Sequence, residues 1–248
     1  MTKITGIDAD TILYLACYSK EKEKTYIDVL TDCDAIINDI LSSTQADYYV
    51  GYLTDGSFRY KIANQKPYKG NRIGIPKPKY FGIAKEYLLD EYKFITEKDL
   101  EADDLCIMTS TYIKNQKEDI QYTIASPDKD LRQIHGLFYD YKKKEFEEID
   151  LQTAYKNLWR QVLTGDSGDN IQGLQGIGPV KADKILDNAE TNNYREIVLN
   201  QYIETYGEYD GIVRFTEIYR LVKMLQTREN YELYIPNFIK VKNCLDEW

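Results

Sequence analysis

Acidic residues recur where predicted strands end and predicted helices begin. Asp8 and Asp10 follow a short apolar segment, Asp55 follows a second, and Asp128 and Asp130 follow a third. Ligands of open α/β sheets bind outside the carboxyl ends of the strands, so we expect these side chains to meet at one sheet edge. Two more acidic groups are expected beside them, one at a helix start and one after a long helix: Glu101, Asp103 and Asp104, and Asp166 and Asp169.

A single acidic residue in such a place is usually a helix cap. Ten carboxylates in one small volume, however, would repel one another strongly. Hard divalent cations that prefer oxygen ligands, such as Mg²⁺ or Mn²⁺, remove that repulsion. Two such ions about 4 Å apart can clamp a phosphodiester, one activating water and the other stabilising the leaving oxygen. The acidic residues therefore predict a two-metal site.

Basic residues are concentrated in one stretch of an otherwise acidic chain. The sequence has 41 Asp and Glu against 32 Lys and Arg, a net charge of −9, which is unusual for a protein that binds nucleic acid. One stretch has seven basic residues and no acidic ones: Arg59, Lys61, Lys66, Lys69, Arg72, Lys77 and Lys79. Its prolines and glycines predict a loop. The loop is either merely solvated or meets substrate phosphates, and the acidic groups elsewhere favour the second interpretation.

The remaining composition argues against several kinds of site. His135 is the one histidine, so Ser-His and Cys-His catalysis and histidine-ligated metals are nearly excluded. Cys17, Cys33, Cys106 and Cys244 form no C-x-x-C pair, which argues against zinc and disulfides and for a reducing cytoplasm. The sequence contains no apolar run of membrane-spanning length and no signal-peptide pattern. We expect a cytoplasmic protein that does not enter a membrane.

Predicted strands and helices alternate as far as about residue 150. Strands are expected at 3–8, 48–53, 122–126 and 137–141, and helices at 11–19, 32–44, 79–92 and 101–114, with one opened by Pro127-Asp128 and one running from an Asp150 cap to Leu163. This alternation predicts an α/β fold with a mostly parallel central sheet between helical layers. The later pattern is helical, so we expect an α/β core at 1–150 and an integral helical part at 151–248.

A glycine-rich turn follows the last acidic pair. Gly176-Ile177-Gly178 predicts a tight turn, and Pro179 suits the first turn of a following helix. Backbone amides at such a turn can bind a phosphate without reading base sequence. The turn begins seven residues after Asp169, so a duplex held there would lie close to the predicted metals.

Six stretches of the sequence form a combination that is highly specific for one protein family. They are Ile7-Asp8-Ala9-Asp10, Leu53-Thr54-Asp55, Tyr68-Lys69-Gly70-Asn71-Arg72, Glu101-Ala102-Asp103-Asp104, Ser126-Pro127-Asp128-Lys129-Asp130 and the run from Gly165 to Ala182. In content and order they resemble the 5′-nuclease family: flap endonucleases, the 5′-nuclease domains of bacterial DNA polymerases and bacteriophage 5′→3′ exonucleases. The phage members look closest. The resemblance spans residues 7–182 and, more weakly, Val213–Pro236, and it implies the PIN-like fold of that family.

The resemblance implies a role for each matching residue. Lys69 and Arg72 match a catalytic basic pair that reaches the scissile phosphate. The turn from Gly173 to Gly178 matches a helix-turn-helix variant that grips duplex DNA, often through a bound K⁺. Asp10 matches only some members, and its role stays open. The two metals would be Mg²⁺, with Mn²⁺ as a substitute, held in the first site by Asp8, Asp55, Glu101, Asp103, Asp104 and Asp128 and in the second by Asp128, Asp130, Asp166 and Asp169.

Residues expected to contact DNA lie in the basic stretch and around the glycine turn: Tyr68, Lys77, Lys79, Gly173, Gly176, Gly178 and Lys181. Only 28 residues separate Arg72 from Glu101, which is short for the helical arch through which larger family members thread a 5′ strand. We expect a reduced clamp built from residues 73–97. Aromatic residues in this region, Tyr68 among them, would either stack on unpaired bases or pack in the core.

The implied activity is hydrolysis of DNA phosphodiesters by in-line attack of a metal-activated water. It would be that of a 5′→3′ exonuclease or a structure-specific flap endonuclease in phage DNA replication or primer removal. The expected partner of this monomer is DNA with a 5′ end or 5′ flap, and an RNA–DNA hybrid stays open as a substrate.

Three alternatives remain. Asp8-Ala9-Asp10-Thr11 fits the nucleophile motif of haloacid-dehalogenase-type phosphatases, in which Asp8 would be the nucleophile. Such a phosphatase has no use for the acidic group at 101–104, the basic stretch or the glycine turn. A non-catalytic DNA-binding module would have no use for the carboxylates. An RNA-cutting relative with the same metal site is the third alternative.

Overall fold

A six-stranded sheet forms the centre of the computed structural model, which describes residues 1–19, 23–116, 119–227 and 239–241. Its strands are β1 (Thr2–Asp8), β2 (Tyr48–Tyr52), β3 (Ile120–Ala125), β4 (Gly136–Asp140), β5 (Glu145–Ile149) and β8 (Ile239–Lys240). The order across the sheet is β5-β4-β3-β1-β2-β8. The four inner strands are parallel, and both edge strands are antiparallel to their neighbours. The predicted mostly parallel sheet is confirmed.

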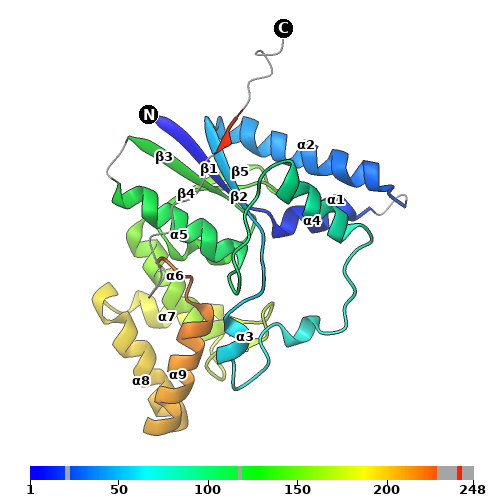
Figure 1. Ribbon diagram of the computed structural model, residues 1–248. Coiled ribbons are helices and arrows are strands. Elements are labelled where there is room, and N and C mark those ends of the chain that lie inside the picture. Colours follow the sequence, from blue (N-terminus) through cyan, green and yellow to red (C-terminus); the bar gives the residue numbers. More distant parts are fainter. Residues whose placement is uncertain (20–22, 117–118, 228–238, 242–248) are drawn as a thin grey trace.

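Helices cover both faces of this sheet (Figure 1). On one face, α1 (Asp10–Cys17), α2 (Tyr26–Thr44) and α4 (Phe81–Asp90) pack with β1 and β2 in a first core. On the other face, α5 (Ala102–Asn115) packs with β1 and β3 in a second core. The last five residues of β1 are all buried, as expected for a parallel strand that is covered on both sides. The carboxyl ends of the parallel strands point toward the helical part of the chain (Figure 1).

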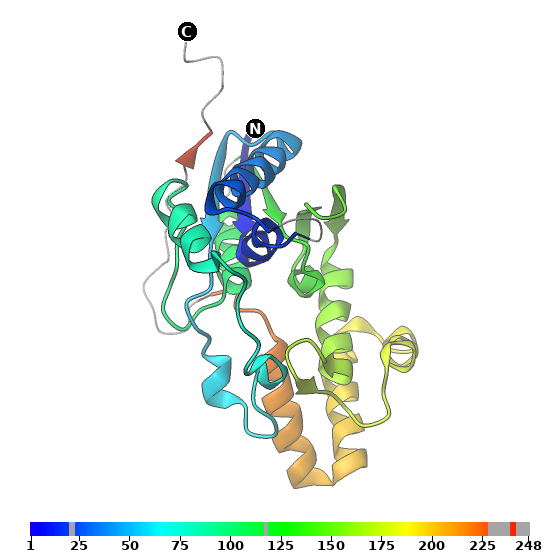
Figure 2. The same ribbon diagram turned by 90° about the vertical axis from the view of Figure 1, so that its right-hand side faces the viewer.

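Residues 151–222 form that helical part (Figures 1 and 2), whereas β8 at 239–240 returns to the edge of the central sheet beside β2. The helical part consists of α6 (Leu151–Thr164), a hairpin of β6 (Gly165–Asp166) and β7 (Ile171–Gln172), α7 (Pro179–Asp187), the 3-10 helix η3 (Thr191–Asn193), α8 (Tyr194–Tyr206) and α9 (Glu208–Val222). Asp150 caps α6 as predicted, because its Oδ1 accepts the Thr153 N–H at 2.7 Å. A third core, built from α6 to α9, also takes in Tyr68 and Ile62, so the helical part packs against the first half of the chain.

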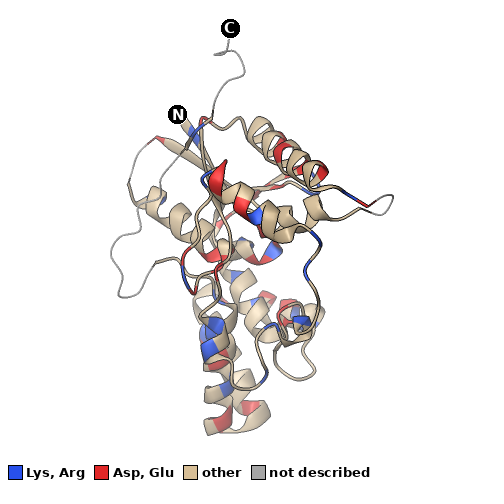
Figure 3. Cartoon of the chain, turned by 45° about the vertical axis from the view of Figure 1, so that its right-hand side comes forward, with Lys and Arg blue, Asp and Glu red and all other residues tan. Residues whose placement is uncertain are grey.

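The basic stretch is more ordered than the predicted loop. It contains α3 (Arg59–Ile62), which packs against α9, and the 3-10 helix η1 (Gly70–Arg72). Residues 73–80, which we call the strap, connect η1 to α4 and carry Lys77 and Lys79. In Figure 3 the segment that runs from the helical part to the α4 layer carries positions coloured as Lys or Arg and passes outside the rest of the chain.

The predicted clamp of residues 73–97 is wrong in its extent. Phe81, Ala84 and Leu88 of α4 are buried in the first core, together with Phe94. Their apolar spacing therefore serves packing between α4 and the sheet layer, and only the strap is left outside the core. Ile73 and Ile75 of the strap are 78% and 67% exposed.

Two local expectations are also wrong. Pro127-Asp128 opens only a 3-10 helix, η2 (Lys129–Gln133), because β4 begins soon afterwards and leaves room for one tight turn. The sequence did not predict β5, because four of its five residues are exposed and its sequence shows no regular alternation of apolar and polar residues. No helix in the described part of the chain is long and apolar enough to cross a membrane.

Cys17, Cys33 and Cys106 are free thiols. Cys244 lies outside the described residues, as do residues 228–236 of the C-terminal stretch that resembles phage exonucleases.

Candidate active site

A first group of carboxylates lies where β1 ends and α1 begins. Asp8, the last residue of β1, is 6% exposed. Burial and the neighbouring Asp10 charge, with a smaller effect of Asp128, raise the pKa of Asp8 to about 7. The Ser126 hydroxyl, which donates to Asp8 Oδ2 at 2.7 Å, opposes this shift. A carboxyl group in such surroundings is most easily ionised with a cation beside it.

The start of α5 adds further acidic groups to this first group. Carboxylate oxygens of Glu101, Asp103 and Asp104 lie within 4.8 Å of one another. Burial, followed by the charges of Asp104 and Glu101, raises the pKa of Asp103 well above its ordinary value. The Asp103 pKa also responds to the charge of Asp8, so β1 and α5 contribute to one electrostatic centre.

A buried guanidinium fixes the start of α5. Arg59 is 1% exposed, and its Nη1 donates to Glu101 Oε2 at 2.9 Å and to Asp104 Oδ2 at 2.5 Å. Asp104 Oδ1 accepts from Arg59 Nη2 at 3.0 Å and from the Leu225 N–H at 2.9 Å. Both oxygens of Asp104 are thus bound by the protein, as are both oxygens of Glu101, and the role of each as a metal ligand stays a prediction. Arg59, which the sequence placed in a substrate-facing loop, is instead a partner of buried carboxylates.

A second group of carboxylates joins the turn after β3 to the hairpin after α6. Asp128 Oδ1 accepts the Asp130 N–H at 2.9 Å. Burial, a hydrogen bond with Asp166 and the Asp128 charge raise the pKa of Asp130 to about 8. The pKa of Asp166 is lowered, because hydrogen bonds from Asp130 and from backbone N–H groups outweigh its burial. Protonated Asp130 can therefore donate to ionised Asp166, and a divalent cation bound between them would take the place of that proton.

Tyr68 connects the two groups. Its hydroxyl lies 2.8 Å from Glu101 Oε2 and 2.7 Å from Asp169 Oδ2. Burial and both carboxylates raise the pKa of Tyr68, so the hydroxyl remains a proton donor. The side chain is 4% exposed and belongs to the third core. Its burial removes Tyr68 from the expected DNA-stacking residues.

The basic turn is held against the loop that carries Asp169. The Lys69 N–H donates to the Asp169 carbonyl at 2.8 Å. Asn71 Nδ2 donates to the carbonyls of residues 167 and 168 at 3.0 and 3.1 Å. Lys69 adopts a left-handed backbone conformation, with φ of 51°, which aims its side chain from this turn toward the carboxylates.

The two expected catalytic basic side chains therefore lie among the acidic groups. Lys69 Nζ contacts Glu101 Oε1 and lies 3.9 Å from Asp169 Oδ2. Burial lowers the pKa of Lys69, but the charges of Glu101 and Asp169 outweigh it and hold the ammonium in its charged form. Arg72 Nη2 donates to Asp169 Oδ1 at 2.8 Å, and its side chain is 56% exposed. One basic group is enclosed and the other faces solvent.

Thr54 and Ser126 are polar residues that the sequence analysis left without a role. Asp10 accepts from Thr54 through both carboxylate oxygens, and Thr54 Oγ1 accepts the N–H of Ala102 at 3.0 Å. Asp10 thus ties the end of β2 to the start of α5. A hydroxyl residue directly after an apolar strand was the available signal for both. Asp55 is exposed just beyond β2, and its role as a ligand stays a prediction.

The donor set fits hard divalent cations. Its atoms are carboxylate oxygens, which suit Mg²⁺ and Mn²⁺ better than softer metals. Asp8, Asp103 and Asp130 have pKa values raised by burial and by neighbouring carboxylates. Bound cations would relieve that repulsion, whereas a site built only for structural ion pairs would place a basic side chain beside each carboxylate.

The glycine turn presents bare backbone to solvent. Gly176 and Gly178 are exposed, and a Cβ atom added to either would meet nothing within 4 Å. Gly176 has φ of 77°, which favours glycine, whereas Gly178 has φ of −96°, which any residue tolerates. Lys181 Nζ donates to the Gly176 carbonyl at 2.9 Å. The turn is open to a phosphate, and its helix-turn-helix role in binding duplex stays a prediction.

Gly173 has a different role from the exposed glycines. A Cβ atom there would lie 2.2 Å from the carbonyl carbon of Thr164 and 2.3 Å from the nitrogen of Gly165. The glycine allows β7 to pack directly against the end of α6, so we remove Gly173 from the expected DNA contacts. Lys77 lies over the Phe81 ring at 4.2 Å, and Lys79 pairs with Glu23 at 2.5 Å. Both lysines remain at the solvent-facing strap.

Comparison with known proteins gives relatives that each match part of this chain. No family model matches it. DNA polymerase I of Rhizobium leguminosarum is 29% identical over 175 residues, 65% of this chain and 15% of that protein. A 5′-3′ exonuclease of Mycoplasma genitalium is 29% identical over 148 residues, 50% of each chain. The flap endonuclease Xni of Shewanella pealeana is 28% identical over 130 residues, 48% of this chain and 50% of that protein. The chain thus spans half or less of the length of these relatives.

Solved structures with the same fold include nucleases. T5 5′-exonuclease with bound divalent zinc ions superposes with a TM-score of 0.58 at 14% identity. The match covers 89% of this chain and 100% of the T5 chain. The catalytic core of Rad2 in complex with DNA substrate superposes with a TM-score of 0.52 at 16% identity, covering 87% and 72%. The chain therefore has the fold of these nucleases, and the resemblance to the 5′-nuclease family predicted from its motifs is confirmed.

Proposed function

We propose that this chain is a divalent-metal-dependent nuclease that hydrolyses DNA phosphodiesters at or near a 5′ end. One observation carries the proposal. Lys69 and Arg72 contact carboxylates at the start of α5 and in the hairpin after α6, and these acidic groups interact in turn with Asp8 at the end of β1 and with Asp130 after β3. Acidic groups that attract metals, next to basic groups that attract phosphate, suit phosphodiester cleavage.

Two metal sites follow from the two carboxylate groups. Asp8, Asp55, Glu101, Asp103, Asp104 and Asp128 would hold the first ion, and Asp128, Asp130, Asp166 and Asp169 the second. We propose Mg²⁺ in both, with Mn²⁺ as a substitute, since the donors are carboxylate oxygens. When bound, such ions supply an activated water and neutralise charge on the phosphate and the leaving oxygen.

Lys69 and Arg72 would bind phosphate in different places. Lys69 is enclosed beside Glu101 and Asp169, so its ammonium would meet charge that develops on the scissile phosphate. Arg72 is more exposed and would contact a phosphate of the approaching strand. Tyr68 keeps Glu101 and Asp169 at a fixed separation through its hydroxyl.

Substrate binding is proposed on the open side of the molecule. Gly176, Gly178 and Lys181 would hold the backbone of a duplex, with K⁺ as an additional ligand of the turn. Lys77 and Lys79 of the strap would contact the 5′ strand. The strap is short and has no helix of its own, which favours a strand that lies against it over one threaded through a large arch.

The biological setting is proposed from the relatives. The names 5′-3′ exonuclease and flap endonuclease support action on a 5′ end or a 5′ flap, and the T5 structure supports a role in phage DNA replication or primer removal. RNA–DNA hybrids are a further proposed substrate. We propose a monomer in the cytoplasm of the host cell. The phosphatase alternative gains no support from these relatives, and both oxygens of Asp10 are engaged by Thr54.

A cleavage assay tests this function. A blunt duplex, a 5′ overhang and a 5′ flap, each labelled at either end, are incubated with protein and Mg²⁺ or with excess chelator. We expect cleavage near the 5′ end in Mg²⁺ alone, and loss of most cleavage with retained DNA binding for Asp130→Asn. Full turnover in chelator, or degradation that starts at the 3′ end, would overturn the proposal.

A further inference from the structure

The turn between β3 and η2 carries two of the proposed ligands, Asp128 and Asp130. It is irregular backbone, and its own internal bonds are few: the Asp128 N–H donates to Ser126 Oγ at 3.0 Å, and the Asp130 N–H to Asp128 Oδ1 at 2.9 Å. The Asp128 and Asp130 carboxylates must keep a defined separation to share ions with their neighbours. Contacts from outside the turn therefore decide how rigid this part of the site is.

Arg132 supplies such contacts. It is 8% exposed, and its Nη1 donates to the carbonyls of Ser126, at 3.3 Å, and Asp128. These two carbonyls flank Pro127, so one guanidinium group spans the backbone of the turn. The guanidinium bonds carbonyl groups and not the ligand carboxylates, so Arg132 leaves Asp128 and Asp130 free to bind cations.

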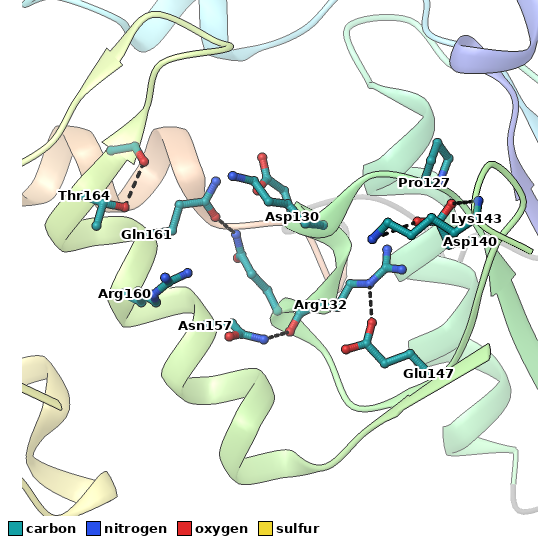
Figure 4. Close-up of a pocket in the computed structure, with 13 residues that line it drawn as sticks. Pro127, Asp130, Arg132, Asp140, Lys143, Glu147, Asn157, Arg160, Gln161 and Thr164 are labelled. Carbon is teal, nitrogen blue, oxygen red and sulfur yellow. Dashed lines mark hydrogen bonds and ion pairs between the residues drawn. The ribbon is translucent and has the colours of Figure 1, made fainter. Parts of the chain in front are cut away.

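Three elements hold Arg132 itself in place. Glu147 of β5 accepts from its Nε at 3.1 Å, and Asn157 of α6 donates to its carbonyl at 3.0 Å. Its guanidinium carbon lies 4.9 Å from the centre of the Phe138 ring in β4. Figure 4 shows Arg132 between Glu147 and Asn157 at the wall of a cavity of about 330 Å³ that Asp130 also lines. The cavity leaves one side of the turn without packing, so the turn depends on Arg132.

We infer that Arg132 is a positioning residue that fixes the Asp128 and Asp130 carboxylates for the second divalent ion, with Glu147 orienting its guanidinium. The inference rests on the proposed function and adds a residue outside the acidic and basic groups described above. Residues that orient metal ligands typically change metal affinity or activity by about 10- to 100-fold when replaced. The ion pair between Arg132 and Glu147 anchors the guanidinium from the solvent side, since the Glu147 side chain is 53% exposed while that of Arg132 is 10% exposed.

The test measures metal binding without DNA. Mn²⁺ is titrated into wild type, Arg132→Gln and Arg132→Lys by calorimetry, and melting temperatures with and without Mn²⁺ report folding. With two Mn²⁺ ions expected to bind, the weaker of the two binding events should lose about tenfold or more in affinity in Arg132→Gln relative to wild type. Arg132→Lys should recover part of that loss. Single-turnover cleavage at saturating Mn²⁺ should recover to within a few-fold of wild type. A purely structural role would lower the melting temperature without this recovery.

Two further variants keep the inference falsifiable if Arg132→Gln does not fold. Glu147→Ala removes the exposed partner only and should weaken Mn²⁺ binding in the same direction by a smaller factor. Arg160→Gln is the matched control, because Arg160 lines the same cavity but pairs with Asp183 at 2.8 Å and does not contact the turn; its Mn²⁺ affinity should stay at the wild-type value.

Unchanged Mn²⁺ binding in folded Arg132 and Glu147 variants of a protein that cleaves DNA would refute the inference and leave the proposed function intact. A wild type that neither binds Mn²⁺ nor cleaves would refute the proposed function.

Discussion

Replacing Lys69 by alanine should lower the single-turnover cleavage rate far more than it weakens DNA binding. The Lys69 ammonium contacts Glu101 Oε1, lies 3.9 Å from Asp169 Oδ2, and is 19% exposed. A unit charge at about 4 Å interacts with another by about 4 kcal/mol at an effective dielectric constant of about 20. Part of that interaction with the phosphate forms only as negative charge develops during cleavage. Loss of one such donor typically lowers the rate by about a hundred- to a thousand-fold.

A second consequence of Lys69→Ala separates catalysis from site disruption. The ammonium and a divalent cation are both attracted to Glu101. Removing the ammonium should therefore leave Mn²⁺ affinity unchanged or tighter, even though the cleavage rate falls. Calorimetry with Mn²⁺ and single-turnover kinetics on a pre-bound 5′-flap DNA measure the two effects separately.

Lys77→Ala is the matched control. Lys77 lies on the strap over the Phe81 ring at 4.2 Å and makes no ion pair among the described residues. Its loss should weaken DNA binding and reduce the slope of log affinity against log salt concentration by about 0.7 for a contact with a single-stranded flap, or about 0.9 for a contact with duplex. The rate of bound complex should stay near wild type. If both lysine variants showed the same binding defect and no rate defect, Lys69 would be only part of a nonspecific basic patch.

Three further predictions follow from other parts of the site. Gly178→Ala, at a φ that alanine tolerates, should lower duplex affinity in a gel-shift titration without changing the melting temperature; unchanged affinity would make the turn a simple helix connection. In chelator, the melting temperature of wild type should fall as pH rises from about 4 to about 8, because the pKa of Asp130 is raised from 3.8 to about 8 and the folded state holds a proton there that the unfolded chain releases. Mg²⁺ should restore that loss, and Asp130→Asn should show a flatter pH profile. Arg59→Met should lower the unfolding free energy by about 3–5 kcal/mol in urea titrations, since it leaves Asp104 buried without its guanidinium partner and leaves Glu101 with Lys69 as its cationic partner; a loss below about 1 kcal/mol would mean that the carboxylates rearrange.

The sequence by itself determined the four inner parallel strands of the sheet and the positions of the acidic residues that follow three of them. The short segments 3–8 and 48–53 lack charged residues in their interior and are too short for a helix of ordinary length, which favours buried strands, and β1 and β2 confirm them. Acidic residues placed directly after such strands must lie at one sheet edge. Asp8, Asp128 and Asp130 therefore met the expectation without any knowledge of tertiary contacts.

Tertiary structure alone decided which polar side chains face the metals and which support them. Arg59 and Lys69 lie in one basic stretch, yet Arg59 is buried against Asp104 and Lys69 lies beside Glu101 and Asp169. From sequence, Tyr68 was expected either to stack on DNA bases or to pack in the core, and the structure places it in the third core, where it joins two carboxylate groups. The pattern of apolar and polar residues along one helix or strand indicates which of its faces is buried. The roles of Arg59, Lys69 and Tyr68 depend instead on partners from distant segments. The sequence contains both partners of each contact, but only the folded chain brings them together.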